Sequence, residues 1–352
     1  MKLRYLDFET SLGEAASVAD TAAVIGRMTA GARFTARAYA TLRADGEHIR
    51  VGNDVYFGEH ATSHIVDAKI GTTIGNDVTV GRYAVVHGCT LGSRIVVGEG
   101  SAVMDDARVA DDTVIAADSI VSPGKKLAGG WLYEGVPAKP VRTIDRDEIA
   151  AIAVSIRSGA PAGVVRSNGL PPLLDGPRSH SKTTGARSDT SYVATTTALG
   201  GDVELHDDAG VYFGCVLHAH DGRIVIGART NVQDNCFLIT SKARGELVFG
   251  VGATVGHNVQ MGSGSFGDDC LVGMLSRVGD RVIVEPGGCI AAGAWVDAGT
   301  VVKAGWIWAG RPARAFRELR PAEREEFARG RDVYVEYGAA YRAGFSFAKG
   351  SS

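Results

Sequence analysis

The sequence predicts an all-β protein with two parallel β-helix domains, each built from hexapeptide repeats and each followed by an α-helix. Three observations predict this fold. An apolar residue recurs at every sixth position, and the whole pattern occurs twice in the chain. The chain also contains 47 glycines in 352 residues, a glycine content about twice the usual 7%. A pattern that repeats at a fixed offset indicates a duplicated repeat architecture.

The first copy carries the apolar residues at steps of six, with a single step of five, and the second copy repeats the series 175 positions later. The two series are Ile74, Val80, Val86, Leu91, Val97, Val103, Val109, Ile115 and Val121, and Phe249, Val255, Met261, Phe266, Val272, Val278, Val284, Ile290 and Val296. Steps of six would turn an α-helix by about 240° each and would leave no apolar stripe. Short strands separated by turns fit the period better, so we expect a coil with one flat side per hexapeptide. The surplus glycine is then expected at turn positions with positive φ, which Gly, Asn and Asp adopt at low cost.

The duplication divides the chain into a first β-helix domain at residues 1–157, a linker at 158–188 and a second β-helix domain at 189–352. The linker is predicted from the run of Gly, Pro and Leu at residues 169–177, which is typical of a loop.

A helix is predicted at the end of each domain. Residues 145–158 begin with acidic residues and continue with apolar residues at helical spacing. Residues 321–345 carry an aromatic stripe of Phe327, Tyr334, Tyr337 and Tyr341 at spacings of seven, three and four. We expect this stripe to pack against the flank of the β-helix.

Charge and cysteine usage exclude several classes of protein. The net charge of −3 provides no global basic field to hold nucleic acid or an anionic membrane. No apolar run approaches the roughly 18 residues of a membrane span, and residues 1–7 lack the apolar core of a secretory signal. The five cysteines, at positions 89, 215, 236, 270 and 289, have no CxxC spacing, which favours buried thiols in a reducing compartment. We therefore expect a cytoplasmic protein.

Several segments resemble the gamma-class carbonic anhydrase family of left-handed β-helix proteins. They are residues 43–52 and 134–144 of the first copy and residues 216–235, 255–258 and 309–319 of the second. The most specific are Asn231-Val-Gln-Asp234 and Gly256-His257-Asn258. The resemblance covers both copies and implies that both β-helices are left-handed.

The resemblance also implies a zinc or iron ion at the interface between packed subunits, bound by two histidines of one subunit and one of its neighbour. The matching positions are His64, Arg82 and His87 in the first copy and Ile239, His257 and Gly262 in the second. Neither copy alone keeps the three imidazoles that a catalytic zinc site needs. Because the losses are complementary, we predict a composite site between the first and second domains, with His64, His87 and His257 as metal ligands.

Residues around the ligands differ between the copies in the same way. The family's interface Arg and Asp match Arg43 and Asp45 of the first copy, and the second copy has His218 and His220 at these positions. The family's polar loop matches Asn231, Gln233 and Asp234 of the second copy, and the first copy has Tyr56, Gly58 and Glu59 there. The resemblance implies that Gln233 orients the attacking hydroxide or the substrate and that Arg43 pairs with Asp234. Such residues fix ligand geometry. Glu59 and Glu99 are two candidates for proton transfer.

The implied reaction is hydration of CO₂ or a related carbonyl compound by metal-bound hydroxide. In carbonic anhydrase the metal lowers the pKa of its bound water to about 7, so that hydroxide is present at neutral pH. The expected partners are a small-molecule substrate and further copies of the chain, because the resemblance implies a homo-oligomer packed through β-helix faces in a trimer-like arrangement.

Four alternatives remain open at the level of sequence. If first copies pack with one another, Arg82 would repel a metal and would favour an anionic ligand. His218 and His220 could form a three-histidine set with His257, because residues two apart on a strand point to the same side. A hexapeptide acyltransferase could use His87 or His257 as general base. The incomplete triads also suit a catalytically inactive scaffold or assembly protein.

Overall fold

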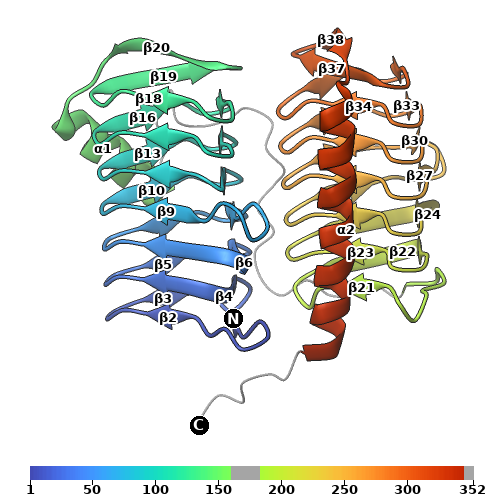
Figure 1. Ribbon diagram of the computed structural model, residues 1–352, viewed down its shortest axis with the longest axis horizontal. Helices are drawn as coiled ribbons and strands as arrows, with labels where there is room; N and C mark the ends of the chain where they lie inside the picture. The colour runs from blue at the N-terminus through green and yellow to red at the C-terminus, as the bar shows by residue number, and fades with distance from the viewer. Residues whose placement is uncertain (160–182, 345–352) are drawn as a thin grey trace. The chain divides into compact units, whose positions relative to one another are not determined.

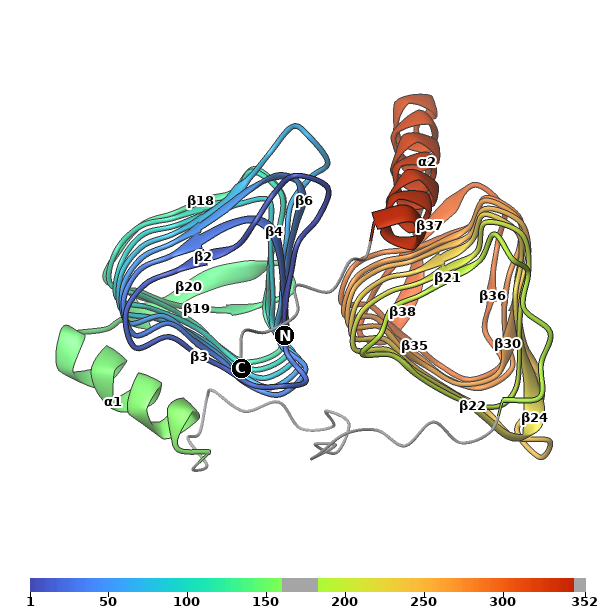
Figure 2. The same cartoon turned by 90° about the horizontal axis from the view of Figure 1, so that it is seen from below.

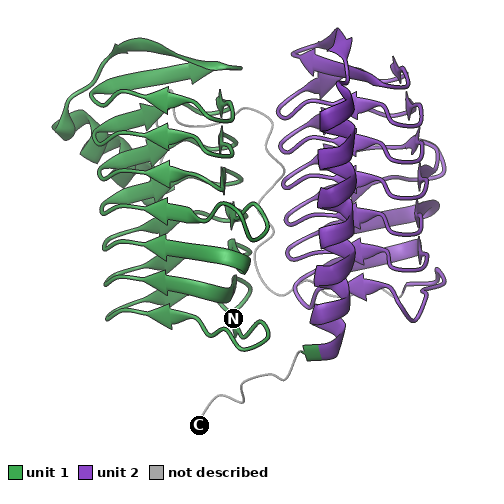
Figure 3. Ribbon diagram, in the orientation of Figure 1, with its two compact units in different colours: residues 1–176, 344–352 green, residues 177–343 purple. Residues whose placement is uncertain are grey.

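The chain forms two compact units, and a computed structural model describes residues 1–159 and 183–344. The first unit covers Met1–Gly176 with Gly344–Ser352, and the second covers Pro177–Ala343 (Figure 3). Residues 160–182, which make up most of the predicted linker, lie outside the described residues. The boundaries 1–157, 158–188 and 189–352 therefore stay a prediction.

The first unit is a β-helix of stacked coils (Figure 1), and each coil is roughly triangular when seen end-on (Figure 2). A 12-stranded sheet forms two of its sides: β1 (Lys2–Leu3), β2 (Ser11–Leu12), β4 (Ala23–Ala30), β6 (Thr41–Val51), β8 (Thr62–His64), β9 (Thr72–Ile74), β11 (Val85–His87), β12 (Thr90–Leu91), β14 (Ala102–Val103), β15 (Arg108–Val109), β17 (Ile120–Val121) and β18 (Lys126–Leu127). An 8-stranded sheet forms the third side: β3 (Ser17–Val18), β5 (Thr35–Ala36), β7 (Tyr56–Phe57), β10 (Val78–Val80), β13 (Ile95–Val97), β16 (Thr113–Ile115), β19 (Trp131–Gly135) and β20 (Ala138–Thr143).

The second unit repeats this design. A 10-stranded sheet contains β22 (Ala198–Leu205), β24 (Val216–Ile226), β26 (Phe237–Ile239), β27 (Leu247–Phe249), β29 (Gln260–Met261), β30 (Gly264–Phe266), β32 (Arg277–Val278), β33 (Val282–Val284), β35 (Trp295–Val296) and β36 (Val301–Val302). An 8-stranded sheet contains β21 (Tyr192–Val193), β23 (Gly210–Val211), β25 (Asn231–Val232), β28 (Thr254–Val255), β31 (Leu271–Val272), β34 (Cys289–Ile290), β37 (Trp306–Gly310) and β38 (Ala313–Glu318).

Each unit has a core of its own, formed by the six-residue ladder. The strands pair in parallel from one coil to the next, so that Val80 lies beside Val97 and Val97 beside Ile115. Every residue of the first ladder is buried in the first core, and every residue of the second ladder is buried in the second. Because successive strand residues point to opposite faces, the residues on either side of each ladder position point outward. The two predicted β-helix domains are confirmed.

The reason expected for the surplus glycine is only partly right. Many corners with positive φ are occupied by other residues, such as Asp54 (φ 59°), Asp77 (φ 54°) and Tyr83 (φ 55°). Gly98, in contrast, has no positive φ, but a Cβ there would lie 2.5 Å from the backbone nitrogen of Ala117 in the next coil. Hexapeptide glycines of this kind are needed because the coils stack too closely for a side chain.

Both predicted helices are present. Helix α1 (Arg146–Arg157) begins after Asp145, whose side chain accepts a hydrogen bond from the backbone N–H of Glu148, as expected of an N-cap. Its residues Ile149 and Ile156 pack with Val96, Val114 and Leu132 on the outer face of the 8-stranded sheet. Helix α2 (Pro321–Gly344) runs along the second unit (Figure 1). Neither helix, nor any other in the described ranges, has the length and apolar character needed to cross a bilayer.

The aromatic stripe of α2 packs against the β-helix, as predicted. Tyr334, Tyr337 and Tyr341 are buried. The ring of Tyr341 stacks on Tyr192 and meets Phe213 edge-on. The five cysteines are buried free thiols, as their scattered positions indicated.

Candidate metal centre

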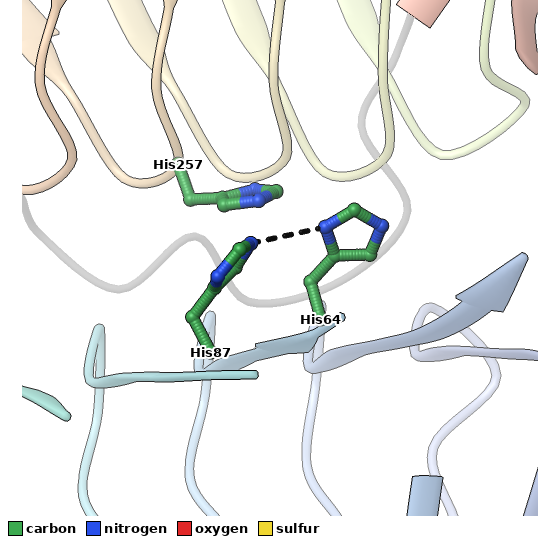
Figure 4. A group of neighbouring side chains, drawn as sticks. All are labelled: His64, His87 and His257. Carbon is green, nitrogen blue, oxygen red and sulfur yellow. Dashed lines mark hydrogen bonds between the residues drawn. The ribbon is translucent and has the colours of Figure 1, made fainter. Parts of the chain in front are cut away.

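The paired histidines of the first unit lie side by side on neighbouring coils. His64 ends β8 and His87 ends β11, and the register of these parallel strands places the two residues opposite each other. Both point outward, since the ladder residue Val86 between Val85 and His87 points into the core. Nδ1 of His64 lies 3.3 Å from Nε2 of His87, the contact drawn as a dashed line in Figure 4.

A carboxylate holds the far nitrogen of each ring. Oδ1 of Asp45 lies 2.9 Å from Nε2 of His64, and Oδ1 of Asp105 lies 2.6 Å from Nδ1 of His87. Burial raises the pKa of Asp105, but attraction to His87 and the hydrogen bond from that ring outweigh it and bring the pKa below its ordinary value. Asp105 is therefore expected to accept the ring proton of His87 at neutral pH.

This arrangement determines which nitrogens are available to a cation. A neutral imidazole carries one proton, and the carboxylates place it on Nε2 of His64 and on Nδ1 of His87. The remaining lone pairs, on Nδ1 of His64 and Nε2 of His87, then face each other at 3.3 Å. Two facing lone pairs repel unless a proton or a cation lies between or beside them. The pair thus has the donor chemistry of zinc or iron, with the outer carboxylates typical of metal-bound histidines.

Arg43 supports this group from the same unit. Its guanidinium donates a hydrogen bond to Oδ2 of Asp45, whose other oxygen contacts His64. The Arg43–Asp234 pair expected from the resemblance would join the two units and stays a prediction.

The position that lost its histidine in the first unit is filled by an ion pair. Nε of Arg82 lies 2.9 Å from Oε1 of Glu99. Glu59 is also paired, with Nε of Arg37 at 3.1 Å. Both candidate proton carriers therefore stand next to a guanidinium, and Arg82 is not an isolated cation awaiting an anion.

The single histidine of the second unit is held by its own set of neighbours. His257 lies at the corner before β29, where its Nδ1 is 3.1 Å from Oδ2 of Asp234. Oδ1 of Asp234 accepts a hydrogen bond from the backbone N–H of Phe213, which fixes the carboxylate. Nε2 of His257 faces the hydroxyl of Tyr334 in α2 at 3.4 Å.

The polar loop of the second unit forms a short hydrogen-bonded chain. The side-chain amide of Gln233 donates to Oδ1 of Asn231 at 3.3 Å. Asn231 in turn donates to the hydroxyl of Thr254 at 3.0 Å. The Asn231 and Gln233 side chains are thereby oriented by the unit itself.

The lost pair in the second unit is also replaced by an ion pair. Arg244 contacts Asp280, with Nε 2.9 Å from Oδ1. A Cβ at Gly262, the counterpart of His87, would lie 2.0 Å from Oδ1 of Asp280 and 2.6 Å from a guanidinium nitrogen of Arg244. The Arg244–Asp280 pair thus occupies the space that a histidine at position 262 would need.

The alternative set of His218, His220 and His257 is not brought together. The rings of His218 and His220 do contact, with centroids 4.1 Å apart, and burial together with repulsion by His220 lowers the pKa of His218. His218, however, is in register with Ile239, at the far end of the strand face from the corner that carries His257. At about 3.3 Å per strand residue this separates His218 from His257 by roughly 10 Å or more.

Three contacts of this centre were missed by sequence reasoning: Asp105 at His87, Tyr334 at His257, and the Arg244–Asp280 pair. A signal for the first was available, because Asp105 and Asp280 occupy the same position in the two copies. Nothing in the sequence places Tyr334 beside His257, because this contact depends on how α2 lies on the β-helix.

Comparison with known proteins supports the family resemblance, although no model of a known protein family matches the chain. The chain is 32% identical over 138 residues to mitochondrial gamma carbonic anhydrase 1 of Arabidopsis thaliana, covering 38% of this chain and 50% of that protein. It is 34% identical over 154 residues to a carbonic anhydrase of Geobacillus kaustophilus, covering 44% of this chain and 84% of that protein. The match thus spans about half the length of the plant relative.

Among solved structures, a hexapeptide transferase family protein of Anaplasma phagocytophilum is 30% identical, with a TM-score of 0.42. That match covers 45% of this chain and 92% of the other. The bacterial carbonic anhydrase, which is matched over most of its length, decides the assignment. The chain belongs to the gamma-class carbonic anhydrase-like family of left-handed β-helix proteins.

Proposed function

We propose that the protein is a metal-dependent lyase that hydrates CO₂ or a related small carbonyl compound, and that His64, His87 and His257 together bind one zinc or iron ion. Figure 4 draws these three side chains. The observation that carries the proposal is the carboxylate-held pair of the first unit, in which Nδ1 of His64 lies 3.3 Å from Nε2 of His87.

We expect such a site to draw on both domains. In the first unit, positions 82 and 87 lie at opposite ends of the face that contains β11 (Val85–His87). Five residues of largely extended chain separate them, which is roughly 10 Å or more, whereas the ligands of one zinc ion lie within about 2 Å of the metal. A third histidine must therefore come from a different β-helix. His257 is the one that the second unit retains at the matching position.

The chain's own residues have defined tasks in this proposal. Asp45 and Asp105 hold the protons of His64 and His87 away from the ligand side, and a carboxylate oxygen of Asp234 lies 3.1 Å from Nδ1 of His257. A bound divalent ion supplies Lewis-acid activation of water near neutral pH. Gln233, held by Asn231, orients the substrate or the attacking water through a hydrogen bond.

Charge at the edge of the site is supplied by the ion pairs. Arg43 is proposed to pair with Asp234 in addition to its bond to Asp45. Glu59 and Glu99 stay predicted proton carriers, each beside an arginine. By analogy with the family, we further propose a homo-oligomer packed through β-helix faces.

Metal analysis of three histidine variants tests the proposal. We expect purified protein to contain about one zinc or iron ion per chain, matching one set of three imidazoles, and to show hydratase activity. His64→Ala and His257→Ala should each abolish both properties. His218→Ala is the matched control, since this histidine contacts the ring of His220 and is not one of the three proposed ligands, and it should retain both.

Loss of metal in only one of the two variants would contradict a shared site. Loss in His218→Ala and His257→Ala but not in His64→Ala would instead favour a set within the second unit. Metal-free protein without hydratase activity would favour the inactive scaffold. Metal-independent acyl transfer that is lost in His87→Ala would favour the acyltransferase alternative.

A further inference from the structure

We propose that Asp105 is a positioning residue, which holds the proton of His87 on Nδ1 and so fixes Nε2 as the nitrogen that binds the metal. The inference rests on the proposed function and adds to it a residue that the family resemblance does not provide. Its direct evidence is the 2.6 Å contact between Oδ1 of Asp105 and Nδ1 of His87.

The backbone anchors Asp105 next to the imidazole. Asp105 follows Met104, the residue that comes after β14 (Ala102–Val103), and Val103 pairs with Val86 beside His87. The carbonyl of Asp105 accepts a hydrogen bond from Gly124 of the next coil at 2.8 Å. The carboxylate is therefore delivered to the ring by the stacking of the coils and not by a flexible loop.

The second copy provides an internal comparison. Asp280 occupies the same position as Asp105, but its copy has Gly262 in place of His87. There the carboxylate binds the guanidinium of Arg244 and accepts a hydrogen bond from the backbone N–H of Ser263 at 3.0 Å. The first copy has Gly88 at the position of Ser263, and its N–H donates to the carbonyl of His64 instead.

The two carboxylates thus serve different tasks on the same scaffold. Asp280 supports a turn and balances an arginine, so its role is structural. Asp105 contacts the ring of His87, and we expect it to act on a metal through that ring. An outer carboxylate of this kind sets the tautomer and raises the basicity of the ligand, and its removal commonly costs about 10- to 100-fold in metal affinity.

Zinc affinity of the full-length protein, measured by competition with a chromogenic chelator, tests the inference. Asp105→Ala is expected to weaken zinc binding by about 10- to 100-fold. Asp105→Asn should recover part of the affinity, because its amide oxygen still accepts the Nδ1 proton. Asp280→Asn, the matched control, should bind zinc as the unaltered protein does. The visible spectrum of the cobalt-substituted protein should change in Asp105→Ala, which a purely structural effect would not cause.

Each outcome separates the possibilities. Unchanged zinc affinity and an unchanged cobalt spectrum in Asp105→Ala would overturn the inference and leave the proposed function in place. Equal losses in Asp105→Ala and Asp280→Asn would overturn it as well, since they would indicate a general effect on the coils. Failure of the unaltered protein to bind zinc or iron would overturn the proposed function and this inference together.

Discussion

Replacing Gly98 by alanine should destabilise the protein much more than the same change at Gly124, although only Gly124 has a positive φ. At Gly98 the added Cβ would lie 2.5 Å from the nitrogen of Ala117 and 2.8 Å from the carbonyl oxygen of Ile115. At Gly124 the φ is +70°, and nothing lies within 4 Å of the added Cβ. The Gly98 variant thus tests the space between coils, and the Gly124 variant tests the cost of a positive φ.

The magnitudes follow from these surroundings. The atoms that crowd Gly98 belong to the backbone of a coil held about 4.8 Å away, so they cannot rotate aside, and overpacking of this kind costs about 1–3 kcal/mol or more. A left-handed conformation costs an L-residue about 1–2 kcal/mol. Both variants regain about 0.4–1 kcal/mol because alanine restricts the unfolded chain. We expect a net loss of about 2 kcal/mol for Gly98→Ala and of about 1 kcal/mol for Gly124→Ala.

Urea unfolding followed by far-ultraviolet circular dichroism measures both values. The second unit supplies a repeat of the experiment, because Gly273 has its added Cβ 2.4 Å from the nitrogen of Ala292, and Gly299 has φ +72° with nothing within 4 Å. Gly273→Ala should again be the more damaging change. If the positive-φ variants lost as much stability as their partners in both units, the explanation from coil spacing would be wrong.

Three further outcomes follow from the structure. Asp145→Ala removes the acceptor for the N–H of Glu148 at the start of α1 and should cost about 1 kcal/mol in a urea titration, whereas Asp145→Ser should cost little. The pKa of Glu323 is held well below its ordinary value by hydrogen bonds from Arg317 and Arg320. The stabilisation it provides is present above its unfolded pKa of about 4.3 and is lost as the pH falls further. The difference in melting temperature between the unaltered protein and Glu323→Gln should therefore narrow below about pH 4.3. A difference that stays constant with pH would show that the charge of Glu323 does not contribute to stability. Zinc at 100 times its dissociation constant should stabilise the protein by about 2.7 kcal/mol, measured by thermal unfolding with and without a chelator, and should leave His257→Ala unaffected.

The fold could be predicted from the sequence because every coil of a β-helix depends on the same six-residue apolar repeat, and this repeat occurs many times in the chain. Each coil needs one inward apolar residue per side, and the residues that meet this need, such as Val97 and Val272, stand at fixed intervals. The interval does not place His64 beside His87, because 23 positions separate them. Their proximity is implied by the family resemblance, and the strand register confirms it.

Two of the three contacts that escaped prediction join segments that the hexapeptide period does not relate. Tyr334 reaches His257 from a helix 77 positions later in the chain, and Arg244 reaches Asp280 across 36 positions. The spacing of these residues in the sequence does not predict that either pair is in contact. From the sequence alone, the glycines are explained by the backbone freedom needed at corners. Gly98, in contrast, is required because the backbone of the next coil lies too close for a side chain, and the sequence does not show the distance between coils.

The Arg82–Glu99 and Arg244–Asp280 pairs stand where the family resemblance implies metal-binding histidines. Reintroducing a histidine at position 262 alone would drive its Cβ to 2.0 Å from a carboxylate oxygen of Asp280, and a histidine at position 82 would leave Glu99 without its guanidinium partner. A histidine at position 262 would therefore require the Arg244 and Asp280 side chains to move, and one at position 82 would break the Arg82–Glu99 pair. Restoring a metal ligand to either copy would thus require a change in these ion pairs as well as the new histidine.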